Sequence, residues 1–317
     1  MTTTFAPARS TSPPRSKPRV CLALPGAGTA LGVISGALEV LCEEVEPVAV
    51  GGTSGGGLVA LALAHGFTPE QTSNIVGEML QRKDFLDKGW PFDQSPGLFK
   101  GRRIAAMLKK TFGENTMMGQ LQLPARVCAW DAWTREPVVF CSKAHPDVLV
   151  WRAARATMAI EFFFDLVRAR SDNARLYGDG GLVVNVPYGL WDDRPEPTIG
   201  LRFSHQHPGF HVADLIRSGT GNTGDVKPVK SWRDMVPAVV ETALSTASAS
   251  WPSEKPDGNT RGGPGVGGAG GVDIGGFHEV VLESDADGMA FGLAPTEVAR
   301  RRQHGRLSAQ RAKLRLL

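Results

Sequence analysis

The chain has 317 residues, of which 42% are hydrophobic and 21% are charged, and its formal net charge is +3. This composition excludes disordered and fibrous proteins and provides a sizeable core for one large domain or two small ones. No apolar run reaches the roughly 18 residues that a membrane-spanning helix requires. Because the N-terminus lacks the apolar core of a secretion signal, we expect a soluble protein of the cytoplasm.

Basic residues gather at the two ends of the sequence. Residues 1–18, rich in Ser, Thr, Pro and basic side chains, predict a disordered basic tail ahead of a single domain over residues 19–317. Residues 300–317 contain six Arg and one Lys but no acidic residue, which leaves the rest of the domain acidic. Such charge runs more often form a solvated helix face and an unstructured arm. Peripheral contact with an anionic membrane is the second interpretation, and we expect no nucleic-acid partner.

The first part of the predicted domain alternates between strands and helices. Residues 19–24 favour a short strand, and residues 33–45 have apolar side chains at helical spacing. A second strand is predicted over residues 45–50, and a helix over residues 58–66 ends in a glycine. Strand, helix, strand and helix in this order predict a right-handed βαβ unit of a parallel sheet.

Further along, helical periodicity alternates with short apolar runs. The elements we expect are helices over residues 67–80 and 100–113, paired strands over 125–133 and 136–142, a short helix from 151, a strand ending in the turn YGDGG, a strand over 278–282 and a helix from about Pro295, interrupted by Gly305. Residues 251–276 are rich in Gly and Pro, which predicts a mobile loop and a candidate lid. The four cysteines lack CxxC spacing, so we expect buried thiols rather than a metal site.

The glycine-rich turn GGTSGGG, residues 51–57, has two interpretations. A phosphate-binding loop of the GxxxxGK[ST] type needs a lysine, and this turn has none. The earlier turn PGAGTALG, residues 25–32, has GxGxxxG spacing rather than the GxGxxG of dinucleotide-binding proteins, and no acidic residue ends the second strand. Nucleotide binding is therefore disfavoured.

The other interpretation is that the turn presents Ser54 as a nucleophile. Gly52 and Gly56 stand two residues before and after it, and they remove side chains that would clash where a strand turns sharply into a helix. The serine hydroxyl is then exposed at the positive N-terminus of the helix, where an oxyanion is stabilised. A serine that only caps the helix is the alternative.

A nucleophile requires a base, and none of the seven histidines stands in a compelling setting. Asp179 does, because a predicted strand presents it in a turn with Gly180 and Gly181. An aspartate that hydrogen-bonds the serine in a water-poor site becomes basic enough to take its proton. An aspartate that only caps a turn is the alternative.

Four segments in order resemble the patatin-like phospholipase family. They are the loop PGAGTALG, the elbow GGTSGGG, the segment RATMAIEFFFDLV, which resembles the family's RASxAxP stretch, and DGGLVVNVP, which resembles its DGG…NxP ending. The likeness covers most of residues 19 to about 190. It implies a three-layer α/β/α fold with a mainly parallel central sheet.

The resemblance also implies a catalytic Ser-Asp dyad that works without histidine. Carried onto this sequence, Ser54 is the nucleophile and Asp179 is the base. The oxyanion hole consists of the backbone amides of Gly26, Ala27 and Gly28.

Two departures from the family pattern stand out. The family's loop reads GGGxRG or GGGxKG, whereas this chain has Ala27, Ala30 and Leu31 in place of a glycine, the basic residue and a glycine. Where the family's RASxAxP stretch ends in proline, this chain has Glu161, followed by three phenylalanines at residues 162–164. The first departure bears on the oxyanion loop and the second on the acyl pocket.

The function that this resemblance implies is that of a serine lipid acyl hydrolase of the phospholipase A or lipase type, which cleaves acyl esters through an acyl-serine intermediate. We expect a lipid or acyl-ester substrate and neither a metal nor an organic cofactor. Two alternatives stay open. One is an esterase or thioesterase on soluble acyl substrates, and the other is a catalytically weak patatin-like binding or signalling protein that keeps the elbow.

Overall fold

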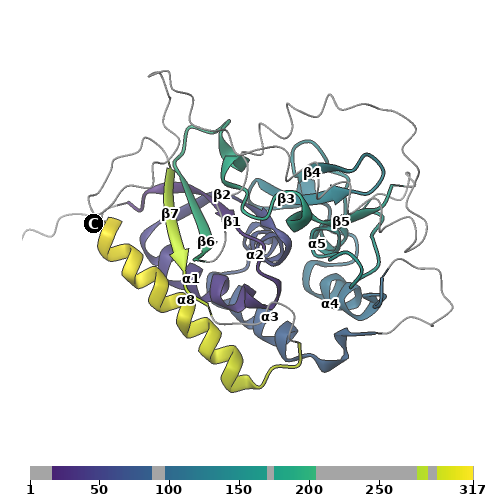
Figure 1. Cartoon of the computed structure of the whole chain (residues 1–317). Helices are drawn as coiled ribbons and strands as arrows, with labels where there is room; N and C mark the ends of the chain where they lie inside the picture. Colours follow the sequence, from purple (N-terminus) through teal and green to yellow (C-terminus); the bar gives the residue numbers. More distant parts are fainter. Residues whose placement is uncertain (1–15, 88–96, 170–174, 205–276, 285–290, 317) are drawn as a thin grey trace, which may run out of the picture.

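The structure is a computed structural model, and it describes residues 16–87, 97–169, 175–204, 277–284 and 291–316. The expected mobile loop over residues 251–276 lies outside the described residues, as do the first 15 residues of the expected basic tail. In Figure 1, helices surround a central sheet, and the C-terminal helix runs along the outside of the molecule.

Within the described residues, the central sheet has seven strands in the order β4-β3-β2-β1-β6-β7, with β5 paired to β3. They are β1 (Arg19–Leu24), β2 (Glu46–Thr53), β3 (Ala125–Asp131), β4 (Glu136–Cys141), β5 (Tyr177–Asp179), β6 (Thr198–Phe203) and β7 (Phe277–Leu282). Only β4 and β5 run antiparallel to their neighbour, β3. The predicted α/β class with a mainly parallel sheet is confirmed, whereas β6 was not expected from the sequence.

The helices lie close to their predicted positions. In the described residues they are α1 (Leu31–Glu44), α2 (Ser54–His65), α3 (Pro69–Gln81), α4 (Arg102–Phe112), α5 (Val150–Thr157) and α8 (Pro295–Leu316). Most residues of α1 and α2 are buried, as expected for helices that are apolar on all sides. α3 begins with a capping box, in which the side chains of Thr68 and Gln71 bond to each other's backbone amides.

Side chains of β1 alternate between the two faces of the sheet. Leu22 and Leu24 belong to the core cluster that contains residues of α1, α2 and α8. Cys21 and Ala23 belong to the cluster on the opposite face, with Trp191 of a short 3-10 helix. Both faces of the sheet are therefore covered, as a mainly parallel sheet requires.

The helix α8 runs without a break through Gly305, so the predicted interruption at this residue is wrong. The glycine is needed because α8 packs very closely on α1. A Cβ on Gly305 would overlap the Val33 carbonyl oxygen, and a Cβ on Gly36 would overlap the Arg302 carbonyl oxygen. This close packing outweighs the low helix propensity of glycine.

Several arginines of the basic C-terminal segment are engaged inside the fold. They form ion pairs with Glu297 (Arg300 and Arg301) and with Glu39 (Arg302 and Arg306). Arg301 is only 4% exposed and also donates to the Thr29 carbonyl at 2.8 Å. Removing residues 300–317 would therefore uncover α1, and contact of this segment with an anionic membrane stays a prediction.

Candidate active site

The strand β3 brings the two predicted catalytic residues together. Its first half pairs with β2, so that Cys128 lies opposite Thr53, and its second half pairs with β5, so that Ala129 lies opposite Asp179. β2 and β5 therefore pair with the same edge of β3, one after the other. The change from β2 to β5 lies where β2 ends and the chain turns into α2 at Ser54. Two residues 125 positions apart in the sequence meet at this edge.

Ser54 lies in a tight turn between β2 and α2. It is the first residue of α2, which begins four residues before the predicted start, and its φ of +51° is rare for a residue other than glycine. The neighbouring glycines allow this turn to approach the end of β1. A Cβ on Gly52 would lie 2.7 Å from the Leu24 carbonyl oxygen, and a Cβ on Gly56 would overlap the Pro25 carbonyl oxygen. This geometry is that of a nucleophile elbow.

The Ser54 hydroxyl donates to Oδ2 of Asp179 at 2.6 Å. Oδ1 of Asp179 accepts from the Gly181 amide at 2.7 Å. Gly180 lies so close to β3 that a Cβ on it would overlap the Cys128 carbonyl oxygen. The serine and the aspartate are 6% and 4% exposed. Burial raises the pKa of Asp179 to about 7, although the bonds from Ser54 and Gly181 lower it in part. A carboxylate with such a pKa can act as a base near neutral pH.

The loop after β1 lies over the first turn of α2. The Gly28 carbonyl oxygen and the Ala27 side chain lie next to Gly55, the residue after the serine. The amide of Gly26 donates to the Asn185 carbonyl at 2.7 Å, so it is not free to bind an oxyanion in this conformation. The amides of Ala27 and Gly28 have no hydrogen-bond partner within the described part of the chain. Of the three predicted donors, Ala27 and Gly28 therefore have free amides in this conformation, and an oxyanion hole at this loop stays a prediction.

One residue that holds Ser54 in place is not among the residues predicted from the sequence. Thr157, at the end of α5, is fully buried, and its Oγ1 accepts a hydrogen bond from the Ser54 amide at 2.9 Å. Its hydroxyl donates to the Cys128 carbonyl. The signal was present in the sequence, since Thr157 stands at the serine position of the RASxAxP-like stretch.

We expect Thr157→Val to lower ester turnover about tenfold and the stability of the fold by about 1–3 kcal/mol. The variant keeps the shape of the side chain but leaves the Ser54 amide buried without a partner and removes a hydroxyl donor from the Cys128 carbonyl. Thr157→Ser keeps both bonds and is the matched control. Turnover of a chromogenic ester and thermal unfolding measure the two effects, and equal turnover in the two variants would contradict a role for Thr157 in positioning the nucleophile.

The described histidines lie away from the dyad. His65 ends α2, where its Nε2 lies 3.1 Å from the Phe112 carbonyl oxygen, and Nδ1 of His145 accepts from the Cys141 amide. Three others lie outside the described residues: His205, His207 and His211. Among the residues that the structure describes, no group of three His, Cys, Asp or Glu could hold a metal ion, and all four cysteines are free thiols.

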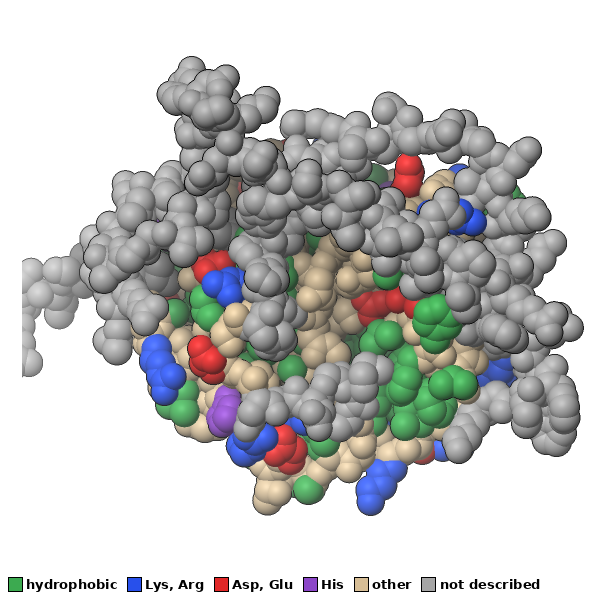
Figure 2. Space-filling model, in the orientation of Figure 1, with side chains coloured by type: hydrophobic (Ala, Val, Ile, Leu, Met, Phe, Trp, Pro, Cys, Tyr) green, Lys and Arg blue, Asp and Glu red, His purple; other side chains and the backbone are tan. Residues whose placement is uncertain are grey.

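Apolar side chains gather where the segment between α5 and β5 meets the residues just before α4. Leu98 and Phe162 are 68% and 39% exposed, and the Leu98 amide donates to the Phe162 carbonyl at 3.0 Å. Phe99, Phe163 and Phe164 pack together, with ring centroids 4.8–6.3 Å apart. Figure 2 shows hydrophobic side chains gathered on the right of the view, in the region where α4 lies in Figure 1.

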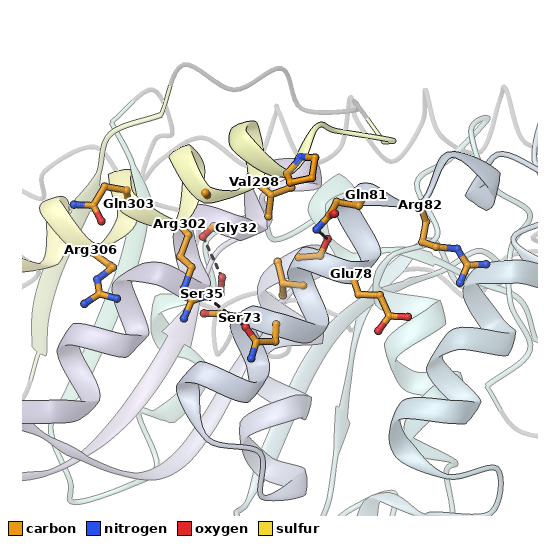
Figure 3. A pocket seen from close by; sticks show the side chains of 15 residues that line it. Gly32, Ser35, Ser73, Glu78, Gln81, Arg82, Val298, Arg302, Gln303 and Arg306 are labelled. Atoms are coloured by element: carbon orange, nitrogen blue, oxygen red, sulfur yellow. Dashed lines mark hydrogen bonds between the residues drawn. The ribbon is translucent and has the colours of Figure 1, made fainter.

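A groove of about 770 Å³ lies between α1, α3 and α8, and Figure 3 shows the side chains that line it. None of its lining residues belongs to the predicted catalytic site. Its three arginines are already paired, Arg302 and Arg306 with Glu39 and Arg82 with Asp84. The groove therefore results from the way α8 packs against α1 and α3, and it is separate from the candidate active site.

Comparison with known proteins gives a family match and distant relatives. A family model for patatin-like phospholipases matches residues 22–190, more than half of the chain. The uncharacterised protein R571 of Acanthamoeba polyphaga mimivirus is 24% identical over 198 residues, which cover 59% of this chain and 66% of that protein. The 85/88 kDa calcium-independent phospholipase A2 of Rattus norvegicus is 27% identical over 234 residues, which cover 63% of this chain and 25% of that protein.

The fold of the chain also resembles a solved structure. The crystal structure of VipD from Legionella pneumophila matches with a TM-score of 0.55 at 12% identity, over 94% of this chain and 67% of that one. The chain spans less than two thirds of the viral relative and a quarter of the rat phospholipase. None of the helices in the described ranges is long and apolar enough to cross a membrane.

Proposed function

This chain belongs to the patatin-like phospholipase family, and from that premise we propose that it is a serine lipid acyl hydrolase with a Ser54–Asp179 dyad. The observation that carries the proposal is the 2.6 Å hydrogen bond between these side chains at a turn with positive φ. The exposed Leu98 and Phe162 support a lipid rather than a water-soluble acyl substrate.

In the proposed reaction, Asp179 takes the proton of the Ser54 hydroxyl while Oγ attacks the carbonyl carbon of the acyl ester. The oxyanion of the tetrahedral intermediate accepts hydrogen bonds from the amides of Ala27 and Gly28, and the N-terminus of α2 adds positive potential. The carbonyl then re-forms as the ester bond breaks, and Asp179 gives its proton to the leaving alcohol oxygen. Water, deprotonated by Asp179, then attacks the acyl-serine. As the bond between the acyl carbon and Oγ breaks, Asp179 returns the proton to Oγ and the fatty acid is released.

Two assays test this proposal. A fluorophosphonate probe should label the wild-type chain and not Ser54→Ala, because it reacts with an activated serine. Incubation with mixed vesicles of phospholipid and neutral lipid should release free fatty acid, measured by mass spectrometry. Turnover of a soluble short-chain ester without lipid hydrolysis would replace the lipid hydrolase by the soluble esterase. A wild-type chain that the probe does not label would favour the catalytically weak binding protein.

We expect kcat/KM for a soluble ester to rise about tenfold per pH unit up to about pH 7 and to level off between pH 7 and pH 8. Asp179 must be ionised to accept a proton, and burial raises its pKa to about 7, so the rate is lost as the pH falls through that value. Measurements between pH 5 and pH 8 check this. A profile that is flat over this range would contradict Asp179 as the base.

A further inference from the structure

A carboxyl group with no part in the proposed reaction lies beside Asp179. Glu161 stands in the segment between α5 and β5, and its Oε1 lies against Gly178, where a Cβ would overlap it. Trp130 and Leu166 enclose the same glycine. An acidic side chain therefore occupies an apolar corner next to the residue that precedes the proposed base.

The two carboxyl groups differ in their hydrogen bonds. Oε1 of Glu161 is shielded from solvent and has no hydrogen-bond partner among the described residues. Asp179 accepts from the Ser54 hydroxyl and the Gly181 amide, and both bonds stabilise its charged form. Since two carboxylates close together repel each other, a single negative charge goes to Asp179 first.

Other charged groups lie in and next to this segment. They include Asp131, paired with Arg175 at the end of β3, and Asp165, paired with Lys100. Arg155 of α5 lies over the ring of Phe164, and its Nη1 has no hydrogen-bond partner among the described residues. Burial raises the pKa of Glu161 well above its usual value, and the charge of Asp179 raises it further. The backbone amides of Glu161 and Asp179 lower this pKa only in part.

We propose that Glu161 stays protonated while the enzyme works, and that its ionisation at alkaline pH places a second negative charge beside Asp179 and suppresses turnover. The inference rests on the proposed dyad. Oε1 of Glu161 lies against Gly178, and the partner of the Ser54 hydroxyl is Asp179, so in this proposal Glu161 is a positioning residue that acts through Asp179. A second charge opposes the oxyanion that forms at Ser54, in a buried site where solvent screens charges poorly. The family pattern has proline at this position, which cannot ionise. We therefore expect the fall in rate at alkaline pH only in chains that carry an acidic residue here.

The test compares kcat/KM for a soluble chromogenic ester between pH 5 and pH 10. The wild-type rate should fall about tenfold per pH unit on the alkaline side, whereas Glu161→Gln should stay level there with its acidic limb unchanged. Glu136→Gln is the matched control, because the pKa of Glu136 is also raised by burial and by a neighbouring aspartate, Asp131. It should keep the wild-type profile.

Three outcomes would overturn the proposal. The first is an alkaline limb that persists in Glu161→Gln, and the second is a wild-type profile that stays level to pH 10. The third is an acidic limb that moves to lower pH in Glu161→Gln, because this would mean that Glu161 ionises before Asp179 and had raised the pKa of the base.

A second measurement does not depend on hydrolysis. Since the pKa of Glu161 in the folded chain lies above its unfolded value of about 4.5, the Tm of Ser54→Ala should fall as the pH rises from 4.5 toward the folded value. Adding Glu161→Gln, or Glu161→Met if the amide disturbs folding, should reduce this dependence, and an unchanged dependence would overturn the proposal. Persistent turnover in Ser54→Ala would refute the dyad, while the Tm comparison would still decide whether Glu161 is protonated.

Discussion

Ser54→Ala and Asp179→Asn are each expected to lower ester turnover by at least about a thousandfold, and the double variant should lose no more than the worse single variant. The two groups act as a unit, because the hydroxyl is activated only by the carboxylate that accepts its proton at 2.6 Å. Initial rates on a chromogenic acyl ester measure the loss for the three variants. Near-additive losses would mean that the two side chains act independently.

The control for this experiment is another buried aspartate of the same sheet. Asp131 is 3% exposed at the end of β3, and its Oδ1 accepts from the Trp133 amide, so Asp131→Asn removes a buried charge without touching the dyad. The folded fraction of the Asp131→Asn variant should hydrolyse the ester at the wild-type rate. Near-normal activity in Asp179→Asn together with an inactive histidine variant, such as His65→Ala, would replace the aspartate by a histidine as the base.

The parts of the site that the sequence predicts are those that depend on local geometry. Gly52 and Gly56 flank Ser54, and Gly180 follows Asp179. These turns need glycine because they bring backbone atoms into contact, where a Cβ would not fit. The hydrophobic period of each helix is also local, and the helix boundaries follow from it to within a few residues. These features are visible in the sequence because each residue constrains its near neighbours.

The parts that the sequence does not predict depend on pairing between distant segments. Nothing in the residues of β5 indicates that it continues the edge of β3 beyond β2, yet this register sets Asp179 beside Ser54. The bond from the Gly26 amide to the Asn185 carbonyl likewise joins two loops, and it changes which amides remain for an oxyanion. The sequence predicts a helix break at Gly305 because helix propensity is local, whereas the contact of Gly305 with α1 is tertiary.

Because α8 packs so closely on α1, replacing a glycine of this contact by alanine should lower the stability of the fold, although helix propensity alone would raise it. Alanine is a better helix former than glycine by about 1 kcal/mol, yet Gly305→Ala and Gly36→Ala should each destabilise the chain by about 2–3 kcal/mol. The new methyl group would overlap a carbonyl oxygen of the facing helix, at Val33 or Arg302. Backbone atoms cannot rotate away as a side chain can, so α1 and α8 must separate along their shared surface.

Gly77→Ala provides the matched control, since Gly77 lies inside α3 and a Cβ there would meet Val298 Cγ1 at 3.4 Å and Gln81 Nε2 at 4.0 Å, both ordinary contacts. This variant should gain about 0.5–1 kcal/mol from helix propensity alone. Urea unfolding of the three variants measures the changes, and thermal unfolding should show shifts of roughly 2–4 °C per kcal/mol for a chain of this size. A gain in stability at all three positions would mean that α1 and α8 pack no more closely than ordinary helices, and that the glycines of the two helices are not required by their contact.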